Sequence, residues 1–548
     1  MKKLQSSFAL LALLALATAC GAPADAPEGE ASAEEPAAQA VPEGAPRLVL
    51  LLAVDQMRAD YLERFAPLLT SGLERLLREG VVFTDAHHFH AATETAPGHA
   101  TLATGVFPSR HGIIGNGWFD RETGDDAYCC DDPEHGVSPR NMLAPAIGDL
   151  MKAVWPQSKV FSASGKDRAA ILMGGHHADG AWWYSRPTGG WVTSTYYGDR
   201  DSGPAWLDDF NAESRLDVLF GTAWEPLMPL EHTAAYDIEP LQRGLSVDTF
   251  PHALGGYTVE RSAFYASIYR SPFLDGHLGD LAETLIEAED LGADEVPDLL
   301  ALSFSALDTV GHSFGPNAPE TLDTILRLDR TIGELLDFVD ERIGMENVVV
   351  ALSADHGVGR VPELVVRDGG EGGRFGAEQT LCLQQLQARL AERFGDGEWL
   401  GDTFYLDEEE IAAAGADRTE IEAEIIDVMG SCPLFHQVLR PADLDPSDPL
   451  HELYLNSRYP GRSPDLIAVP EPNVLQVSAA VVTASHGSPY RYDTHVPLII
   501  RQQDGASRVV EERANTIDLA PSLAALLGLP VDSIAGFEGF NGVDRLAE

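Results

Sequence analysis

Four continuous apolar runs, each followed within a few residues by a charged residue, constrain the fold of this 548-residue chain most strongly. Runs of this length, rich in β-branched residues, are typical of strands buried on both faces, which form parallel sheets covered by helices. The runs are residues 48–54 before Asp55, 160–163 before Lys166, 299–305 before Asp308 and 348–353 before Asp355. We therefore predict an α/β fold, an α/β/α sandwich with a mostly parallel central sheet.

Helical patterns lie between these runs. Candidate helices cover residues 73–78, 320–339 and 516–527, and in the last of them Thr516 is placed to cap the start and Gly528 to end the helix. In an open parallel sheet, ligands bind beyond the carboxyl ends of the strands. The charged residues that follow the four runs are therefore the first candidates for a functional site.

The first 20 residues predict an export signal. Lys2 and Lys3 supply a positive start, residues 8–16 form an apolar run too short for a permanent membrane span, and Ala17-Thr18-Ala19 precedes Cys20. Small residues before a cysteine resemble a bacterial lipoprotein cleavage site, and ordinary cleavage after Ala19 is the alternative. We expect an exported protein, either periplasmic or anchored in the bacterial envelope by a lipid on Cys20.

Composition divides the rest of the chain. Residues 21–46, rich in Ala, Pro and Glu, cannot bury a core and predict a disordered tether. Residues 47–359 and 481–548 are assigned to the main domain, within which about 190–270, rich in Trp, Tyr, Pro and Gly, form a cap or long loops. Residues 360–480, with acidic helical patterns among proline-rich loops, predict a smaller inserted α+β lobe.

A formal charge of −49 predicts a strongly acidic surface. Such a surface repels nucleic acid and anionic lipid, so neither is an expected partner. Phosphate esters are repelled too, and an enzyme acting on them needs local positive charge, which metal ions provide. Besides Cys20 there are Cys129, Cys130, Cys382 and Cys432, which allow three disulfide pairings in an oxidising compartment. A bond between the adjacent Cys129 and Cys130 is disfavoured.

Carboxylates and imidazoles that follow predicted strands form the strongest functional signal. They are Asp55, Asp308, His312, Asp355, His356 and His486, the last of which follows the apolar run 479–482. These side chains are ligands suited to zinc, and three per ion would leave each of two ions an open position. Two such ions can clamp the attacking and leaving oxygens of a phosphoryl transfer. Three other clustered histidines, His87, His88 and His90, are interpreted as loop or strand surface.

Thr95 is the candidate nucleophile. It introduces a predicted helix that ends near Gly105, with Pro97 in the first turn, where proline is favourable. A hydroxyl there lies at the positive end of the helix, where anions are stabilised. Because a threonine alcohol is a weak nucleophile, zinc coordination is needed to lower its pKa. Without the metal ligands, a simple helix cap would be the preferred interpretation.

Seven motifs in a fixed order carry a resemblance to a known family. They are Val54-Asp55-Gln56-Met57-Arg58, Thr95-Ala96-Pro97-Gly98-His99, Gly112-Ile113-Ile114-Gly115-Asn116, Lys166-Asp167-Arg168, Asp308-Thr309-Val310-Gly311-His312, Asp355-His356-Gly357 and His486-Gly487-Ser488-Pro489-Tyr490. Together they resemble the phosphate-irrepressible, PafA-type alkaline phosphatases of the alkaline phosphatase superfamily. The resemblance spans nearly all of residues 47–548 and implies that the main domain is alkaline phosphatase-like and catalytic.

The resemblance implies two zinc ions and no third metal. One ion would bind Asp308, His312 and His486, and the other Asp55, Asp355 and His356, with deprotonated Thr95 bridging to the second ion. Asn116, Lys166 and Arg168 would hold the non-bridging phosphoryl oxygens. Lys166 would stand where other alkaline phosphatases place magnesium. Asp493 and His495 are candidates for groups that support the ligands from behind.

The implied activity is zinc-dependent hydrolysis of small-molecule phosphomonoesters, with a phosphothreonine intermediate and release of inorganic phosphate. One alternative is a phosphodiesterase or nucleotide pyrophosphatase of the same superfamily. Lys166 and Arg168 argue against it, because a diester lacks one of the charges they would bind. A second alternative is a non-catalytic, metal-binding surface lipoprotein, in which Thr95→Ala would leave function intact. The oligomeric state is left open.

Overall fold

The computed structural model describes residues 40–198, 203–239, 241–243, 246–255, 260–397, 399–400, 404–475, 482–529 and 542–546. The predicted export signal, most of the predicted tether and residues 479–481 of the apolar run before His486 lie outside this described part. Among the described residues, no helix has both the length and the apolar character needed to cross a bilayer.

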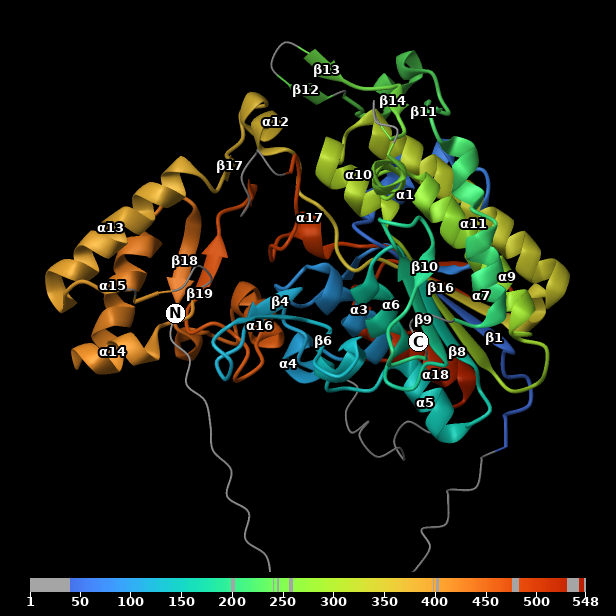
Figure 1. Cartoon of the computed structure of the whole chain (residues 1–548), viewed down its shortest axis with the longest axis horizontal. Helices are drawn as coiled ribbons and strands as arrows, with labels where there is room; N and C mark the ends of the chain where they lie inside the picture. Colours follow the sequence, from blue (N-terminus) through green and yellow to red (C-terminus); the bar gives the residue numbers. More distant parts are fainter. Residues whose placement is uncertain are drawn as a thin grey trace, which may run out of the picture. The chain divides into compact units, whose positions relative to one another are not determined.

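A nine-stranded sheet in the order β10-β9-β8-β15-β1-β16-β21-β2-β22 contains all four predicted runs (Figure 1). Its strands are β1 (Leu48–Val54), β2 (Val81–Phe83), β8 (Val160–Ser164), β9 (Gly180–Tyr184), β10 (Trp191–Val192), β15 (Asp298–Phe304), β16 (Val348–Ser353), β21 (Leu498–Arg501) and β22 (Arg508–Val510). Pairing is parallel except at β9–β10, β16–β21 and β21–β2. The mostly parallel central sheet is therefore confirmed.

Separate hydrophobic cores cover the two faces of the sheet. Alternate residues of β1 point to opposite sides, with Leu50 and Leu52 in one core and Leu51 and Ala53 in the other. The first core includes α2 (Gly72–Glu79), α9 (Phe273–Ala288) and α11 (Pro319–Arg342), and the second includes α5 (Ile147–Val154) and α18 (Leu519–Leu527). This arrangement confirms the α/β/α sandwich.

The predicted start and cap of the last helix are wrong, because α18 begins at Leu519 and the turn before it is capped by Asn515 rather than by Thr516. A 3₁₀ turn, Thr516–Asp518, precedes α18, and the Asn515 side chain accepts a hydrogen bond from the backbone N–H of Ile517. The Thr516 hydroxyl instead lies 2.9 Å from Nδ1 of His88. Asparagine is as good an N-cap as threonine, so residue type alone did not distinguish the two positions. Gly528 ends the helix in the left-handed conformation, as predicted.

A third core belongs to the smaller α+β lobe. Its helices α13 (Ala377–Phe394) and α15 (Arg418–Gly430) pack with the antiparallel pair β18 (Phe435–Leu439) and β19 (Ile467–Pro470). A disulfide joins Cys382 of α13 to Cys432, just after α15, while Cys129 and Cys130 are free and buried. The structure thus forms one of the bonds that the sequence left open, and the disfavoured Cys129–Cys130 bond is not formed. The domain boundaries themselves stay a prediction.

The aromatic-rich segment between residues 190 and 270 lies partly against the helices of the first core. Strand β10 joins the edge of the central sheet, and α7 (Ala205–Ala212) follows it. The buried Trp224 indole donates a hydrogen bond of 2.7 Å to Asp323 of α11. The described residues of the aromatic-rich segment thus extend the layer formed by α9 and α11. A capping role for this segment stays a prediction.

Candidate metal centre

The carboxyl ends of four neighbouring strands carry most of the candidate residues. Asp55 follows β1, and Asp355 and His356 follow β16. Asp308 and His312 lie on α10 (Ala306–Phe314), which follows β15, whereas Lys166 and Arg168 lie at the start of α6 (Asp167–Gly174), which follows β8. Because β8, β15, β1 and β16 are adjacent and parallel, these side chains meet at one edge of the sheet.

The six predicted ligands form two adjoining groups. In the first, Nε2 of His312 and Nε2 of His486 lie 3.2 and 3.6 Å from Oδ1 of Asp308. In the second, Nε2 of His356 lies 3.3 Å from Oδ2 of Asp355 and 3.5 Å from Oδ1 of Asp55. The rings of His356 and His486 stack with their centroids 3.5 Å apart. The structure therefore brings both sets of sequence-predicted ligand atoms together.

Hydrogen bonds define the tautomer of all three imidazoles. Nδ1 lies 2.8 Å from a backbone carbonyl in His312 (Ala484 O) and in His486 (Thr93 O), and 2.9 Å from one in His356 (Gly357 O). A carbonyl oxygen only accepts, so each Nδ1 carries the proton and each neutral ring presents the lone pair of Nε2. Metal-binding histidines are oriented by such contacts.

Unpartnered buried atoms indicate that a cation belongs in the second group. Oδ1 of Asp55, Oδ2 of Asp355 and Nε2 of His356 are buried and have no hydrogen-bond partner within the described part of the chain. Leaving such groups unsatisfied in a low-dielectric interior is costly. Carboxylate oxygens and imidazole nitrogens are ligands for zinc and similar divalent ions. The donor set therefore fits a metal centre.

Lys166 supplies positive charge between the two groups. Its Nζ lies 2.6 Å from Oδ2 of Asp55 and 2.6 Å from Oδ2 of Asp308. Burial opposes the charged form, but the carboxylates of Asp308 and Asp55 outweigh it and raise the pKa of Lys166 above its usual value. The pKa of Asp55 is raised by burial and by the negative charges of Asp308 and Asp355. One lysine is thus shared by two carboxylates.

Thr95 is the first residue of α3 (Thr95–Thr104), and its side chain faces two cations. Oγ1 of Thr95 accepts hydrogen bonds of 3.3 Å from Nζ of Lys166 and 3.2 Å from Nη2 of Arg168. Oδ1 of Asn116 accepts from the backbone N–H of Ala96 at 2.9 Å, which places this amide beside Thr95. The predicted catalytic group therefore lies at the start of α3.

Gln56 is a residue that sequence reasoning missed. Its backbone N–H donates to Oδ1 of Asp355 at 3.1 Å, and its Nε2 donates to Oδ1 of Asp308 at 2.6 Å, so it contacts one ligand of each group. Its φ of 71° lies in the left-handed region, which is uncommon for residues other than glycine and recurs at functional sites. A Cβ at Gly311 would lie 1.9 Å from Oε1 of Gln56, so any side chain at position 311 would displace the Gln56 carboxamide.

Two further residues hold the nucleophile helix in place. Nδ1 of His99 lies 2.8 Å from the carbonyl of Thr95 and 3.2 Å from Oδ2 of Asp355, while its Nε2 lies 2.8 Å from Oγ of Ser303. Glu94 accepts a 2.8 Å hydrogen bond from the backbone N–H of Asn116. Burial raises the pKa of the Glu94 carboxyl. His99 and Glu94 lie in the predicted nucleophile segment, but nothing in their residue types indicated these contacts.

The interpretation of His87, His88 and His90 as surface residues is wrong. All three are buried. Nε2 of His88 lies 2.8 Å from the carbonyl of Ala354, directly before Asp355, so His88 packs behind the ligand loop. Histidine spacing alone could not reveal this, because the burial results from packing against a distant part of the chain.

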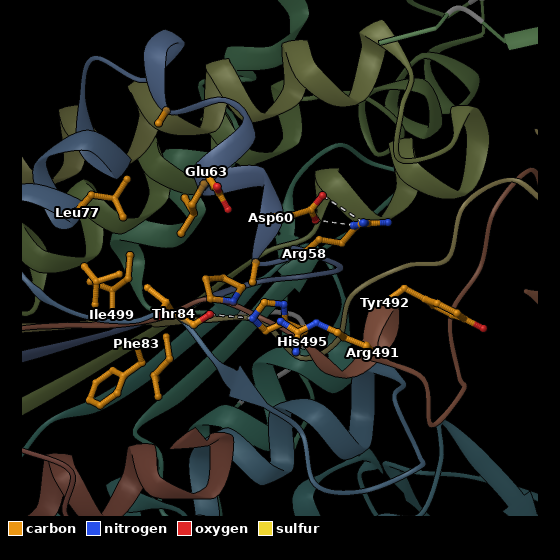
Figure 2. A pocket seen from close by; sticks show the side chains of 16 residues that line it. Arg58, Asp60, Glu63, Leu77, Phe83, Thr84, Arg491, Tyr492, His495 and Ile499 are labelled. Carbon is orange, nitrogen blue, oxygen red and sulfur yellow. Dashed lines mark hydrogen bonds and ion pairs between the residues drawn. The ribbon is translucent and has the colours of Figure 1, made fainter. Parts of the chain in front are cut away.

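Asp493 and His495 lie in different places. Oδ2 of Asp493 accepts from the backbone N–H and hydroxyl of Ser488, and its carbonyl accepts from Gly357 N, which links the loops after His486 and His356. His495 instead donates from Nε2 to the carbonyl of Thr84 at 3.0 Å. It lines a separate pocket of about 720 Å³ beside the Arg58–Asp60 ion pair (Figure 2).

Comparisons with known proteins give a consistent result. Residues 49–488 match the family model described as type I phosphodiesterase / nucleotide pyrophosphatase. The chain is 32% identical to alkaline phosphatase PhoV of Synechococcus elongatus over 506 residues, covering 88% of this chain and 90% of PhoV. It is 30% identical to alkaline phosphatase PafA of Elizabethkingia meningoseptica over 515 residues, covering 89% of this chain and 92% of PafA.

The fold is also similar to a solved structure of PafA. The crystal structure of wild-type PafA aligns with a TM-score of 0.81 at 28% identity and covers 90% of this chain and 97% of that one. A second PafA structure carries substitutions of a threonine, an asparagine, a lysine and an arginine, in that order along its chain.

Proposed function

We propose, on the premise that the chain belongs to the type I phosphodiesterase / nucleotide pyrophosphatase family and is of the PafA alkaline phosphatase type, that it is a zinc-dependent phosphomonoesterase acting through a phosphothreonine intermediate. The single observation that carries this proposal is the meeting of six metal-ligand side chains beside a threonine hydroxyl that faces two cations. Such a site can hold and transfer a phosphoryl group.

The ligand geometry supports two metal positions. Asp308, His312 and His486 would hold one zinc ion, and Asp55, Asp355 and His356 the other. When bound, the two ions lower the pKa of the nucleophilic hydroxyl and neutralise the charge that develops on the transferred group and on the leaving oxygen. The unpartnered atoms of Asp55, Asp355 and His356 support the second position in particular.

The side chains around Thr95 supply the remaining chemistry. Oγ1 of Thr95 attacks phosphorus as the bond from phosphorus to the leaving oxygen breaks, and water then hydrolyses the phosphothreonine to release inorganic phosphate. Lys166 and Arg168 both contact Oγ1 of Thr95, and from these positions they would donate hydrogen bonds to the non-bridging phosphoryl oxygens. Because Oδ1 of Asn116 is occupied by Ala96 N, its Nδ2 is left to donate to a phosphoryl oxygen.

Two cations facing Thr95 favour a monoester as substrate. A phosphomonoester dianion carries one more negative charge than a diester, and charge-assisted hydrogen bonds respond strongly to that difference. Thr95, Asn116, Lys166 and Arg168 have the same types and order as the residues substituted in the PafA variant. This correspondence supports their assignment as the phosphoryl-binding set.

Hydrolysis of p-nitrophenyl phosphate by the purified protein tests the proposal. We expect turnover that is lost on chelation, returns with zinc, and is absent from Thr95→Ala protein that still folds. The methyl diester of the same phenol should be hydrolysed at least about 100-fold more slowly. Faster hydrolysis of the diester would instead identify a phosphodiesterase.

We also propose that the protein is exported, with Met1 to Cys20 as the signal and Cys20 as a candidate lipid attachment site. The Cys382–Cys432 disulfide supports this location, because disulfides persist in oxidising compartments. Mass spectrometry of the mature protein from a bacterial host provides the test. A lipid-modified Cys20 at the N-terminus is expected, and retention of Met1 would contradict export.

A further inference from the structure

We propose that a second pocket, next to the nucleophile, binds the organic group of the substrate and favours phosphate esters whose alcohol carries an aromatic or bulky apolar body. This inference rests on the proposed phosphomonoesterase function and adds a substrate class to it. The pocket has a volume of about 290 Å³, close to the lower end of the range for small-molecule sites.

The position of the pocket connects it to the reacting atoms. Its lining includes Glu94, which directly precedes Thr95, and Gly487, which directly follows the ligand His486. Glu94 is also hydrogen-bonded to Asn116, whose amide lies beside the nucleophile. An ester whose phosphorus lies at Thr95 can therefore extend its organic group along this wall and into the pocket.

The chemistry of the lining changes away from Thr95. The phosphoryl site presents Lys166 and Arg168, whereas the far wall of the pocket is built from the lobe and is largely apolar. Phe435 lies with its ring centroid 5.6 Å from that of Phe375 and 5.6 Å from that of Phe404, both in edge-to-face geometry. Rings arranged in this way offer faces and edges to a further aromatic group.

Aliphatic side chains complete the apolar wall. Leu383, Met429 and Ile467 also line the pocket. Glu94 and Arg458 are its acidic and basic residues, and the Glu94 carboxylate already accepts a hydrogen bond from Asn116 N. Apolar side chains make up most of this lining and stabilise an apolar body by burying its surface. The preferred alcohol is therefore one with an apolar body.

Two esters that differ mainly in apolar size provide the test. Ethyl phosphate and 3-phenylpropyl phosphate are both primary alkyl esters, so intrinsic reactivity contributes little to the difference between them. We expect kcat/KM at least about tenfold higher for the phenylpropyl ester. Of the two matched non-hydrolysable phosphonates, the phenylpropyl compound should have the lower Ki, which measures binding without turnover.

Variants of the pocket test whether the preference for the phenylpropyl ester arises there. Ala468 lies on β19 in the far wall, and Ala468→Trp should fill the pocket and bring the ratio of the two esters close to one, leaving ethyl phosphate turnover within about twofold. Val509→Trp, at an exposed position on β22, is the matched control and should keep the wild-type ratio. Phe404→Ala tests the same wall by removing a ring, and should also lower the ratio.

The outcomes separate the two proposals. Hydrolysis of both esters at equal kcat/KM by the wild type, or a ratio unchanged by both folded pocket variants, overturns the pocket assignment and leaves phosphomonoesterase activity standing. Failure to hydrolyse p-nitrophenyl phosphate and both esters, with or without added zinc, overturns the proposed function and this inference with it, whereas hydrolysis of p-nitrophenyl phosphate alone overturns only this inference. A wild-type preference lost in Ala468→Trp and kept in Val509→Trp supports the assignment.

Discussion

At the scale of single residues, Gln56 has contacts that reach both groups of ligands. Its carboxamide holds Asp308 and its backbone N–H holds Asp355, so the residue fixes the relative position of two carboxylates. Outer contacts of this kind orient metal ligands and tune metal affinity. We therefore place Gln56 as a positioning residue rather than a ligand.

Replacing Gln56 by leucine tests this role. Leucine is similar in size but cannot donate to Asp308, so zinc affinity should fall about 10- to 100-fold while the fold is retained. Isothermal titration of metal-free protein with zinc measures the change. Gln387→Leu, at an exposed position on α13, is the matched control, and unchanged affinity in Gln56→Leu would refute the assignment.

Arg168 is the residue that we propose to distinguish monoesters from diesters. Its guanidinium donates a hydrogen bond to Oγ1 of Thr95, where it would neutralise the extra charge of a monoester. We expect Arg168→Met to lower kcat/KM for p-nitrophenyl phosphate about 100- to 1000-fold and to affect the methyl diester at most about tenfold. Equal losses on both substrates would show that Arg168 acts on structure and not on charge.

At the scale of secondary-structure elements, the link between α9 and α10 places two of the ligands. Asp275 on α9 accepts a hydrogen bond of 3.0 Å from Ala306 N, at the start of the helix that carries Asp308 and His312. Burial raises the pKa of Asp275 to about 7, and its Oδ2 has no hydrogen-bond partner among the described residues. The ionised form of this carboxyl is thus disfavoured in the folded protein.

This shift predicts a pH dependence of stability. The folded-state pKa of Asp275 lies above the unfolded value of about 3.9, so the folded state binds the proton more tightly and stability falls as pH rises through 7. Asp275→Asn keeps the acceptor for Ala306 N and removes the titration. Its unfolding free energy relative to wild type should rise by about 2–3 kcal/mol between pH 5 and pH 8.

Denaturant unfolding at the two pH values measures the difference. Asp208→Asn, at an exposed position on α7, is the control and should show no such trend. A relative stability of Asp275→Asn that is constant with pH would contradict the raised pKa.

The parts of the fold that sequence predicted are those in which burial dominates. β1 and β16 match their predicted runs because every residue in them is buried, and continuous burial produces a continuous apolar run. β9 was not predicted, because its aromatic residues Trp182, Trp183 and Tyr184 lie outside the four apolar runs from which strands were predicted. A long apolar run thus indicates a buried strand well, whereas a short aromatic strand carries no such signal.

The same distinction applies to the site. Aspartate and histidine after a strand indicate metal binding by their own chemistry, so the candidate ligands could be predicted from sequence. Gln56 and His99 act through a left-handed backbone and through hydrogen bonds to distant carboxylates, carbonyls and hydroxyls. Neither the backbone conformation nor these long-range hydrogen bonds can be predicted from residue type, so only the structure reveals the roles of Gln56 and His99.

At the scale of the whole molecule, the charge of −49 opposes compaction. Added salt screens this repulsion, with a Debye length that falls from about 10 Å at 0.1 M to about 3 Å at 1 M. We expect the melting temperature to rise by several degrees between 0.1 and 1 M NaCl, and equally in KCl. A constant or falling melting temperature would show that self-repulsion contributes little.

Zinc titration tests the central claim most directly. Metal-free protein is titrated with zinc while bound metal and p-nitrophenyl phosphate hydrolysis are followed on the same samples. Two ions per chain are predicted, with hydrolysis appearing as the sites fill, and Thr95→Ala is predicted to bind zinc without turnover. Full hydrolysis by wild-type protein from which all metal has been removed would contradict the account.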